Sequence, residues 1–293
     1  MSVVHILQES LVFLPLTLGM HLSYAVLGIA DLTVDGSFVL GAAVCARCMH
    51  AGWPAWAATA AAITAGGLAG VAVALIQRRN RISPLLAGIL ALFILQSVNL
   101  QVMGRPNLPL LNHSTLLTQL MDLLGLRAWG SWAYALALLP LLIVLAALYT
   151  ALLQSPIGLW LRAMGCQQQA VSLMGKDPER LRMLGLACSN ALVACAGLLT
   201  AQLNGYADVG MGTGSVLLGI ATVVIAQQLL TAIRPGRVWG AAWQTAACFV
   251  AVCVYFCSVH LFVAVGLSPH WLKMAIGLGL IAFLRVHRLR REP

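Results

Sequence analysis

Long apolar runs make up most of the chain, and charged residues interrupt them at only a few short stretches. Residues 53–77, 132–153 and 184–203 contain no Asp, Glu, Lys or Arg. Each run reaches the roughly 20 residues that a helix needs to cross a bilayer. Of all residues, 61% are hydrophobic and 9% charged, whereas a soluble domain has about 25% charged residues. The sequence therefore predicts an all-α integral membrane protein, a polytopic helix bundle.

We expect about eight to ten transmembrane helices. The runs long enough to count are residues 11–30, 53–77, 82–103, 132–153, 184–203, 216–233, 238–265 and 271–284. Pro15 and Gly19 are expected kink points in the first of them. The polar residues 31–36 then separate the first run from residues 37–46, a piece too short to span comfortably. A broken or re-entrant helix near residues 31–48 is therefore as well supported as a separate span.

Residues 155–184 form a polar, basic interruption between two apolar runs. Pro156 opens the stretch, and Pro178 stands before the next run. Apolar residues recur between them at multiples of three and four positions, which predicts a short amphipathic helix over residues 161–175. Such a helix cannot cross a bilayer, so we expect it to lie at the membrane surface and to present one face to a partner.

The basic residues predict which side of the membrane each loop occupies. Alternating spans place all but four of the 17 Lys and Arg residues on one side, and those four are Arg47, Arg105, Arg127 and Lys273. Residues 155–184 and the basic C-terminus are thus expected in the cytoplasm. The side of the N-terminus stays open, because it depends on whether residues 37–46 cross the membrane. The positive charge is explained by topology, and nothing indicates nucleic-acid binding.

Two carboxylates stand in the polar interruption after the first run. Asp31 and Asp35 are four residues apart, so on a helix they would share one face. An acid inside a bilayer costs at least about 2.5 kcal/mol and usually faces a protein interior or a water path. The same residues fit a surface loop in which one of the two caps the following helix. Under either interpretation the helix is interrupted here, and both are candidates for a translocation pathway.

Other polar residues stand late in apolar runs or just after them, at the non-cytoplasmic end. They could line the mouth of a pathway, although polar contacts between helices are the commoner explanation. These candidates are Asn99, Gln101, Gln202, Asn204 and Asp208.

The cysteines and motifs indicate no chemistry in this chain. Cys45 and Cys48 have CxxC spacing but lack a second pair. Cys253, Cys257 and His260 could share a helix face, yet packing is the commoner reason for such spacing. No phosphate loop, HExxH or GxSxG pattern occurs. We expect no metal site, no cofactor and no enzymatic activity, and any ATP hydrolysis would belong to another chain.

Three separated segments resemble one family. Residues 31–44 (DLTVDGSFVLGAAV), residues 83–111 and residues 201–225 are similar to the permeases of bacterial ABC importers in the branched-chain amino acid and ribose permease superfamily. The branch most resembled includes tryptophan/tyrosine-type uptake systems. The resemblance covers roughly residues 10–284 and implies a type II ABC importer-like fold. It also implies one transmembrane permease domain over residues 1–293, with residues 155–184 as its cytoplasmic loop.

The resemblance identifies residues 161–175 with the coupling helix, which docks into a separate ATPase subunit. Arg162, Ala163 and Gly165 match the usual RA-x-G opening, and Ala170 and Gly175 match the later small residues. Two departures leave the chemistry of the ATPase contact open. Cys166-Gln167-Gln168 stands where acidic residues or Asn are common, and Ala226-Gln227-Gln228 stands where Gly-Glu is usual.

The resemblance further implies the partners. These are a second copy of the chain in a homodimer, two ATPase subunits that carry ATP and Mg²⁺, and an extracytoplasmic binding protein or lipoprotein. The complex would sit among the lipids of the bacterial inner membrane. The expected solute is a small organic molecule, with an aromatic amino acid as the family-based expectation.

Two other functions are compatible with the residues. An ion-coupled secondary transporter or channel could use Asp31 and Asp35 as a proton or cation site. A membrane metal or redox protein could use Cys45, Cys48 and the face formed by Cys253, Cys257 and His260.

Overall fold

The structure is a computed structural model that describes residues 3–78, 82–111, 113–130, 132–233 and 239–264, together with the single residues 266 and 274. The expected last span and the basic tail lie outside these residues. The same is true of Arg79, Arg81, Arg234, Arg237 and Lys273. The prediction of a cytoplasmic C-terminus therefore concerns residues that the structure does not describe.

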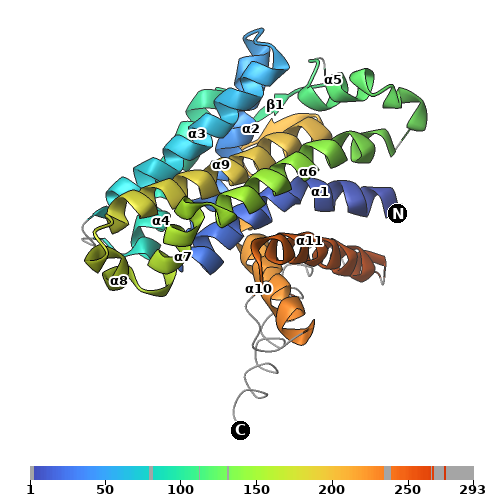
Figure 1. The fold of residues 1–293 in the computed structure, drawn as a ribbon. Coiled ribbons are helices and arrows are strands. Elements are labelled where there is room, and N and C mark those ends of the chain that lie inside the picture. Colours follow the sequence, from blue (N-terminus) through green and yellow to red (C-terminus); the bar gives the residue numbers. More distant parts are fainter. Residues whose placement is uncertain are drawn as a thin grey trace.

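The described chain is a bundle of long helices with a few short elements at its two ends (Figure 1). The long helices are α1 (Val3–Met20), continued by the π-helix η1 (His21–Val26), α2 (Val34–His50), α3 (Ala55–Ile76), α4 (Pro84–Met103), α6 (Trp132–Gln154), α9 (Pro178–Asn204), α10 (Ser215–Ile233) and α11 (Ala241–Ala264). The short elements are β1 (Asn107–Pro109), α5 (Leu116–Leu123), η3 (Leu126–Trp129), α7 (Pro156–Cys166), α8 (Gln168–Leu173) and β2 (Tyr206–Asp208).

Seven helices among the described residues are long and apolar enough to cross a membrane. They are α1 with η1, α3, α4, α6, α9, α10 and α11, and each covers most of an apolar run expected from the sequence. The prediction of an all-α polytopic membrane protein is confirmed. At 17 residues, α2 is shorter than these helices.

Local sequence signals fix several helix ends. Ser83, Ser155 and Asp177 each precede a proline, and each side chain accepts a hydrogen bond from a backbone N–H of the first turn that follows. Proline suits the first helical position because it has no N–H to leave unpaired. At the other end, Gly104 and Gly205 stop α4 and α9 with φ angles of 71° and 77°, which favour glycine.

Helix α9 is the centre of the bundle, and α1, α2 and α3 pack around it (Figure 1). Small residues let these backbones approach closely, as is common between transmembrane helices. At Gly70 of α3, for example, an added Cβ would lie 2.2 Å from the carbonyl oxygen of Leu186 in α9. The α3–α9 contact therefore depends on the absence of a side chain at this position.

The break expected near residues 31–48 falls at residues 27–33, and α2 after it is one unbroken helix. The apolar piece is longer than expected because the helix starts at Val34 and continues to His50. Its start is buried, with Val34 at 0% and Asp31 at 1% exposure. Thus α2 begins inside the bundle, and the interpretation of residues 31–36 as a surface loop is wrong.

A second helix also begins inside the bundle. The strands β1 and β2 form an antiparallel pair in which Asn107 is opposite Asp208. Residues 209–214 then return to the start of α2, where a Cβ on Gly212 would lie 2.2 Å from the carbonyl oxygen of Asp35. From there α10 begins at Ser215. The first turns of α2 and α10 therefore meet within the protein.

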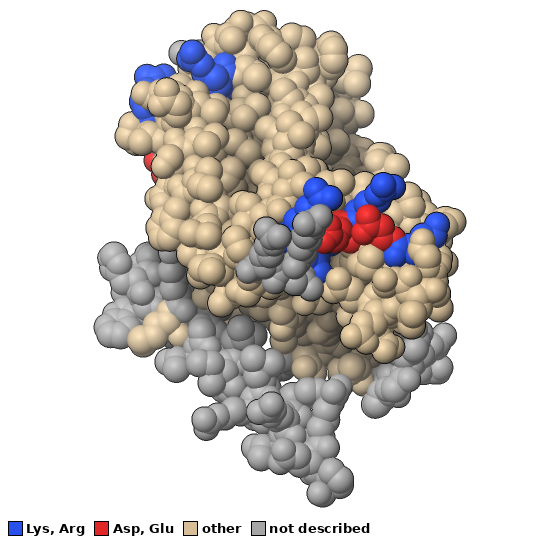
Figure 2. Space-filling view, turned by 90° about the vertical axis from the view of Figure 1, so that its left-hand side faces the viewer, with Lys and Arg blue, Asp and Glu red and all other residues tan. Residues whose placement is uncertain are grey.

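The two ends of the bundle differ in charge and composition. We call the end that carries α7 and α8 the α7 end, and the end that carries β1 and α5 the β1 end. On the face seen in Figure 2, the side of the α7 end, basic and acidic side chains form one mixed cluster, and a separate group of basic side chains lies at the upper left. Of the four basic residues expected on the opposite side, Arg47 lies in the last turn of α2 near the β1 end, and Arg127 lies in η3.

The start of α1 lies far from the α7 end. Gly165 of α7 contacts Val26 at the far end of the α1–η1 helix. His5 and Glu9, near the start of α1, approach His260 near the end of α11 instead. Figure 1 shows the N label and α7 at opposite ends of the bundle. The N-terminal helix, whose side of the membrane the sequence left open, therefore starts on the side of the β1 end.

Candidate functional site

The expected amphipathic helix over residues 161–175 is two helices rather than one. Between α7 and α8, Gln167 has an extended backbone with φ −157° and ψ 98°. Leu161, Met164 and Val171 are buried as expected, but Met174 is 68% exposed. The prediction of one continuous helix is wrong because the chain turns at Gln167, so periodicity cannot be carried across it. The turn leaves residues 166–169 exposed at the α7 end.

Gly165 joins α7 to the end of the first transmembrane helix. A Cβ at this position would lie 1.9 Å from the carbonyl oxygen of Val26, where ordinary contacts begin at 3.4 Å. The same backbone faces Gly28, whose added Cβ would meet the Gly165 carbonyl oxygen at 3.5 Å. Residues 26–28 lead directly into the break before α2. The backbone of α7 at Gly165 therefore packs directly against the segment that leads into α2.

The remaining coupling candidates surround this contact. Ala163 and Ala170 are half-buried, while Cys166 and Gln167 are exposed. Gly175 ends α8 with a φ of 76°. Arg162 is half-buried and points into a cavity described below.

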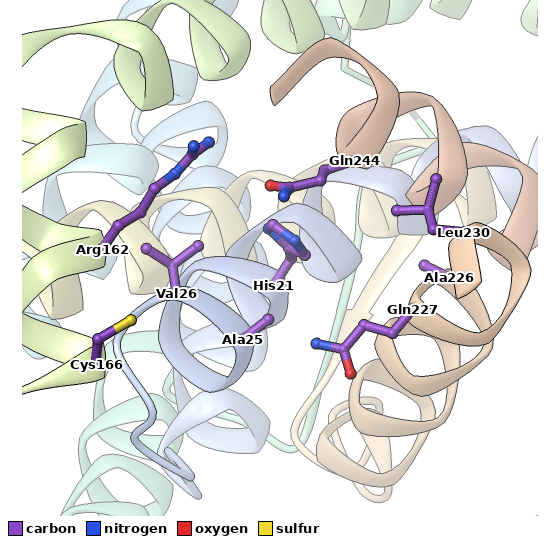
Figure 3. Close-up of a pocket in the computed structure, with 9 residues that line it drawn as sticks. All are labelled: His21, Ala25, Val26, Arg162, Cys166, Ala226, Gln227, Leu230 and Gln244. Atoms are coloured by element: carbon purple, nitrogen blue, oxygen red, sulfur yellow. The ribbon is translucent and has the colours of Figure 1, made fainter. Parts of the chain in front are cut away.

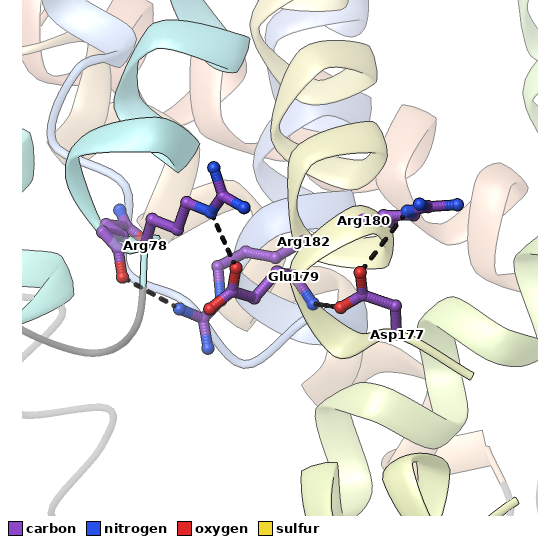
Figure 4. Close-up of polar contacts among 6 residues, drawn as sticks. Arg78, Asp177, Glu179, Arg180 and Arg182 are labelled. Carbon is purple, nitrogen blue, oxygen red and sulfur yellow. Dashed lines mark hydrogen bonds and ion pairs between the residues drawn. The ribbon is translucent and has the colours of Figure 1, made fainter. Parts of the chain in front are cut away.

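Arg182 is a link at the α7 end that the sequence analysis missed (Figure 4). From α9, its guanidinium donates to the carbonyl oxygen of Gln77 at 3.4 Å and to Oε1 of Gln168 at 3.3 Å. It thereby joins the end of α3, α8 and α9. Beside it, Arg78 pairs with Glu179 at 3.1 Å across α3 and α9. Arg182 is 7% exposed, and the sequence does not show that one arginine of this basic stretch is buried while its neighbours are not.

Asp31 belongs to a buried hydrogen-bond network that includes another residue the sequence analysis missed. Its carboxylate accepts from the backbone N–H of Thr33 at 2.9 Å and from the Asn190 amide at 2.8 Å. The amide oxygen of Asn190 accepts in turn from the Ser37 hydroxyl at 2.6 Å. This network fixes the break before α2 against α9, as expected for buried polar groups that must be paired.

Asp35 caps the buried start of α10. Its carboxylate accepts from the Ser215 hydroxyl at 2.7 Å and from the N–H groups of Val216 and Gly214 at 2.8 and 3.2 Å. Helix N-termini carry unpaired N–H groups and partial positive charge, which a carboxylate satisfies. Asp35 and Asp31 thus have separate partners and do not form one shared site. The prediction that Asp31 or Asp35 caps the helix that follows is wrong, because the N-cap of α2 is Thr33 and Asp35 instead caps α10.

We predict that Asp35→Asn destabilises the protein by about 1 to 2 kcal/mol, because a neutral amide replaces a carboxylate cap on a helix start. The measurement is thermal unfolding in detergent, together with faster amide hydrogen exchange in the first turn of α10. Asp122→Asn is the control, since Asp122 lies at the surface in an ion pair with Arg127. Equal melting temperatures for the two variants would contradict the cap.

The other pathway candidates do not converge on one site. The Asn99 amide donates to the Gly36 carbonyl oxygen at 3.0 Å, and Gln202 accepts from the Leu117 N–H at 3.3 Å. Both side chains are buried as helix contacts. Gln101 and Asn204 are exposed, and the half-buried Asp208 accepts from the Gly210 N–H at 2.7 Å.

A cavity at the α7 end collects polar side chains from four helices (Figure 3). It encloses about 260 Å³ between η1, α7, α10 and α11. Its apolar wall is made by Ala25, Val26, Ala226 and Leu230, and its polar lining by His21, Arg162, Cys166, Gln227 and Gln244. Cys166 and Gln227, which stand at the two departures from the family pattern, thus lie at the same cavity.

The cysteines do not assemble a metal site. Across the described residues, no group of three or more His, Cys, Asp or Glu side chains could hold a metal ion. Cys45 is buried and accepts weakly from Gln202 at 3.5 Å. His260 lies 3.6 Å from Glu9 of α1. Cys45, Cys195 and Cys248 are buried, as is common for cysteines that pack in a core.

Comparison with known proteins identifies the family. Residues 2–284 match the model of the branched-chain amino acid transport system permease component, and the chain belongs to this family. It is 42% identical to an uncharacterised protein of Rickettsia prowazekii over 98% of this chain and 97% of that protein. It is 29% identical to the tyrosine transport system permease protein of Clostridioides difficile, over 98% of this chain and 92% of that protein.

A more distant relative is the ribose import permease protein of Escherichia coli (strain K12), at 26% identity over 80% of this chain and 72% of that protein. No solved structure gives a significant match. The resemblance drawn from residues 31–44, 83–111 and 201–225 is confirmed at the level of the family. The chain is a multi-pass permease component of a transport system of the ABC type.

Proposed function

We propose that this chain is the membrane subunit of an ATP-driven importer, and that a separate ATPase docks on the exposed turn between α7 and α8. The observation that carries the proposal is the contact of Gly165 with the backbone of Val26. It connects a surface-exposed helix pair to the break that precedes α2. A docked partner that moves α7 thereby acts on the interior of the bundle.

The proposed mechanism is alternating access driven by two arrangements of this connection. Closure of the ATPase pair on ATP would displace α7 and α8, and the backbone contact would pass the displacement to residues 27–33. Those residues hold Asp31, and the following turn holds Asp35, which caps α10. The starts of α2 and α10 would then shift together and alter the pathway between them and the rest of the bundle.

The family of permease components supports the remaining partners. We place the α7 end in the cytoplasm, where the ATPase carries ATP and Mg²⁺. The β1 end, with β1, α5 and η3, would then receive an extracytoplasmic binding protein. Apolar side chains exposed on α4, such as Phe93 and Ile94, suit lipid or the second copy in a homodimer. This arrangement corresponds to the bacterial inner membrane.

For the solute we propose an amino acid. The relative named for tyrosine transport matches almost the whole chain, whereas the relative named for ribose import matches less of it. At the α7 end, Arg162 also offers the carboxylate of an amino acid a positive charge at a cavity. An ion-coupled carrier is less favoured, because Asp31 and Asp35 are each held in structural hydrogen bonds.

The test is reconstitution in proteoliposomes with the ATPase and the binding protein encoded by neighbouring genes. We expect uptake of labelled tyrosine that requires ATP and all three components. A second set of liposomes contains this chain alone with a proton or sodium gradient and no ATP, and should show no uptake. Gradient-driven uptake by the chain alone would replace the importer proposal with an ion-coupled carrier.

A further inference from the structure

The cavity at the α7 end contains a positive charge that the described structure does not neutralise. The Nη2 atom of Arg162 is buried and has no hydrogen-bond partner among the described residues. None of the nine residues that line the cavity is acidic. A guanidinium is charged at any physiological pH and has five N–H donors to satisfy. Leaving such a donor buried and unpaired is costly, so an acceptor is expected in the cavity.

The rest of the lining suits a small anion. Figure 3 shows Arg162 reaching from α7 toward His21 and Gln244, with Gln227 on the α10 side. The His21 ring is fixed by a 2.7 Å hydrogen bond between its Nδ1 and the Tyr149 hydroxyl, which leaves Nε2 as the ring nitrogen available to an occupant. The Gln227 amide can donate to an oxygen, and the Gln244 amide donates one N–H to the Trp239 carbonyl oxygen at 3.1 Å and retains a second N–H. The donors therefore come from several helices around one volume.

We propose that this cavity binds a small solute through its carboxylate, with Arg162 as the charged partner. The inference rests on the proposed function and deepens it, because it makes the carboxylate the group that the α7 end of the pathway recognises. Guanidinium and carboxylate match in geometry and form strong, charge-assisted pairs. An uncharged sugar would leave the guanidinium without a counter-charge.

The cavity limits the size of the solute. Its 260 Å³ lies just below the range of about 300 to 1,000 Å³ common for small-molecule sites. A single amino acid fits this scale better than a peptide or a nucleotide. Val26 and Leu230 provide an apolar wall for its side chain. Val26 also carries the carbonyl oxygen that touches Gly165, so an occupied cavity adjoins the coupling contact.

Cys166 can report whether the cavity is occupied, because it lines the cavity and is exposed to labelling reagents. The full-length chain is placed in nanodiscs, and its cysteines are labelled with a maleimide and quantified by mass spectrometry. We expect L-tyrosine to slow the labelling of Cys166 but not that of a cysteine introduced by Leu173→Cys on α8, a position that is 90% exposed and outside the lining. L-Tyrosinamide, which lacks the carboxylate, and ribose should give no protection. Protection by tyrosinamide, by ribose, or equally by inorganic phosphate would overturn the carboxylate assignment.

Two pairs of variants test whether the solute carboxylate binds at the positive charge of Arg162. Gln227→Glu places a carboxylate in the cavity, so it should abolish protection by tyrosine. Gln228→Glu adds the same charge one residue away, outside the lining, and should leave protection unchanged. Arg162→Gln should raise the half-protecting concentration about tenfold or more, as expected for loss of a charge-assisted hydrogen bond. Arg180→Gln, at an exposed ion pair of the same end, is its control.

The labelling assay needs no ATPase, so it separates the two proposals. Protection without ATP-driven uptake would retain the carboxylate site and remove the importer mechanism. ATP-driven tyrosine uptake without any protection of Cys166 would retain the importer and remove the site. If Arg162→Gln fails to fold, the comparison of Gln227→Glu with Gln228→Glu still decides the question.

Discussion

Replacing Gly165 by alanine is expected to reduce ATP-driven uptake by at least about tenfold while the ATPase still binds. The added methyl group would lie 1.9 Å from the Val26 carbonyl oxygen, so α7 must move away from η1. Overpacking of this kind commonly costs about 1 to 3 kcal/mol, enough to shift a two-state equilibrium by tenfold or more. The measurement is uptake per ATP hydrolysed in proteoliposomes.

Gly240→Ala is the matched control, because a Cβ at Gly240 meets nothing within 4 Å. Binding of the ATPase to each variant is measured by co-purification. If Gly165→Ala transports as well as Gly240→Ala, movement does not pass through the contact with Val26. If the ATPase no longer co-purifies, Gly165 shapes the docking surface, and transmission through residues 26–28 loses its support.

The second large effect is expected at the α3–α9 contact. Gly70→Ala would bring a methyl group to 2.2 Å from the Leu186 carbonyl oxygen, so α3 and α9 must separate. Backbone cannot yield as a flexible side chain can, and we expect a loss of about 3 kcal/mol. In a thermal unfolding experiment in detergent this corresponds to a decrease of about 5 °C or more in melting temperature.

Gly67→Ala tests whether close approach, and not helix propensity, is responsible. The two glycines lie on the same helix, but a Cβ at Gly67 would be 3.7 Å from the Ala187 carbonyl oxygen, an ordinary contact. Alanine is the better helix former by roughly 0.5 to 1 kcal/mol, so Gly67→Ala should be neutral or slightly stabilising. A similar loss of stability in both variants would contradict the account of the α3–α9 packing.

Most helix limits could be predicted from local sequence. Ser155 before Pro156 and Asp177 before Pro178 begin α7 and α9 as such pairs do in any protein. The apolar runs placed the transmembrane helices to within a few residues, apart from α1 and the start of α9, because span length is set by the thickness of the bilayer. Among the described residues, Arg78 and Arg180 lie at the α7 end and Arg47 and Arg127 lie toward the β1 end, which agrees with the grouping predicted from the sequence.

The interior could not be predicted in the same way, because it depends on contacts between residues far apart in sequence. Asn190 looks like any polar residue in a span, yet its amide bonds to Asp31, 159 residues away. The turn at Gln167 interrupts a regular apolar pattern, and Gly165 two residues earlier does not by itself predict where the helix ends. The sequence marked Asp31 and Asp35 as pathway candidates, but their separate partners come from α9 and α10.

The cap on α10 also has a consequence for biosynthesis. Asp35 is made early, whereas its partner Ser215 follows 180 residues later. At a synthesis rate of about 5 to 20 residues per second, the carboxylate waits roughly 10 to 40 s for that partner. During this time the Asp35 carboxylate must form its hydrogen bonds with water, lipid head groups or an insertion factor. The amino-terminal half of the bundle therefore cannot reach its final arrangement until the ribosome has delivered α10.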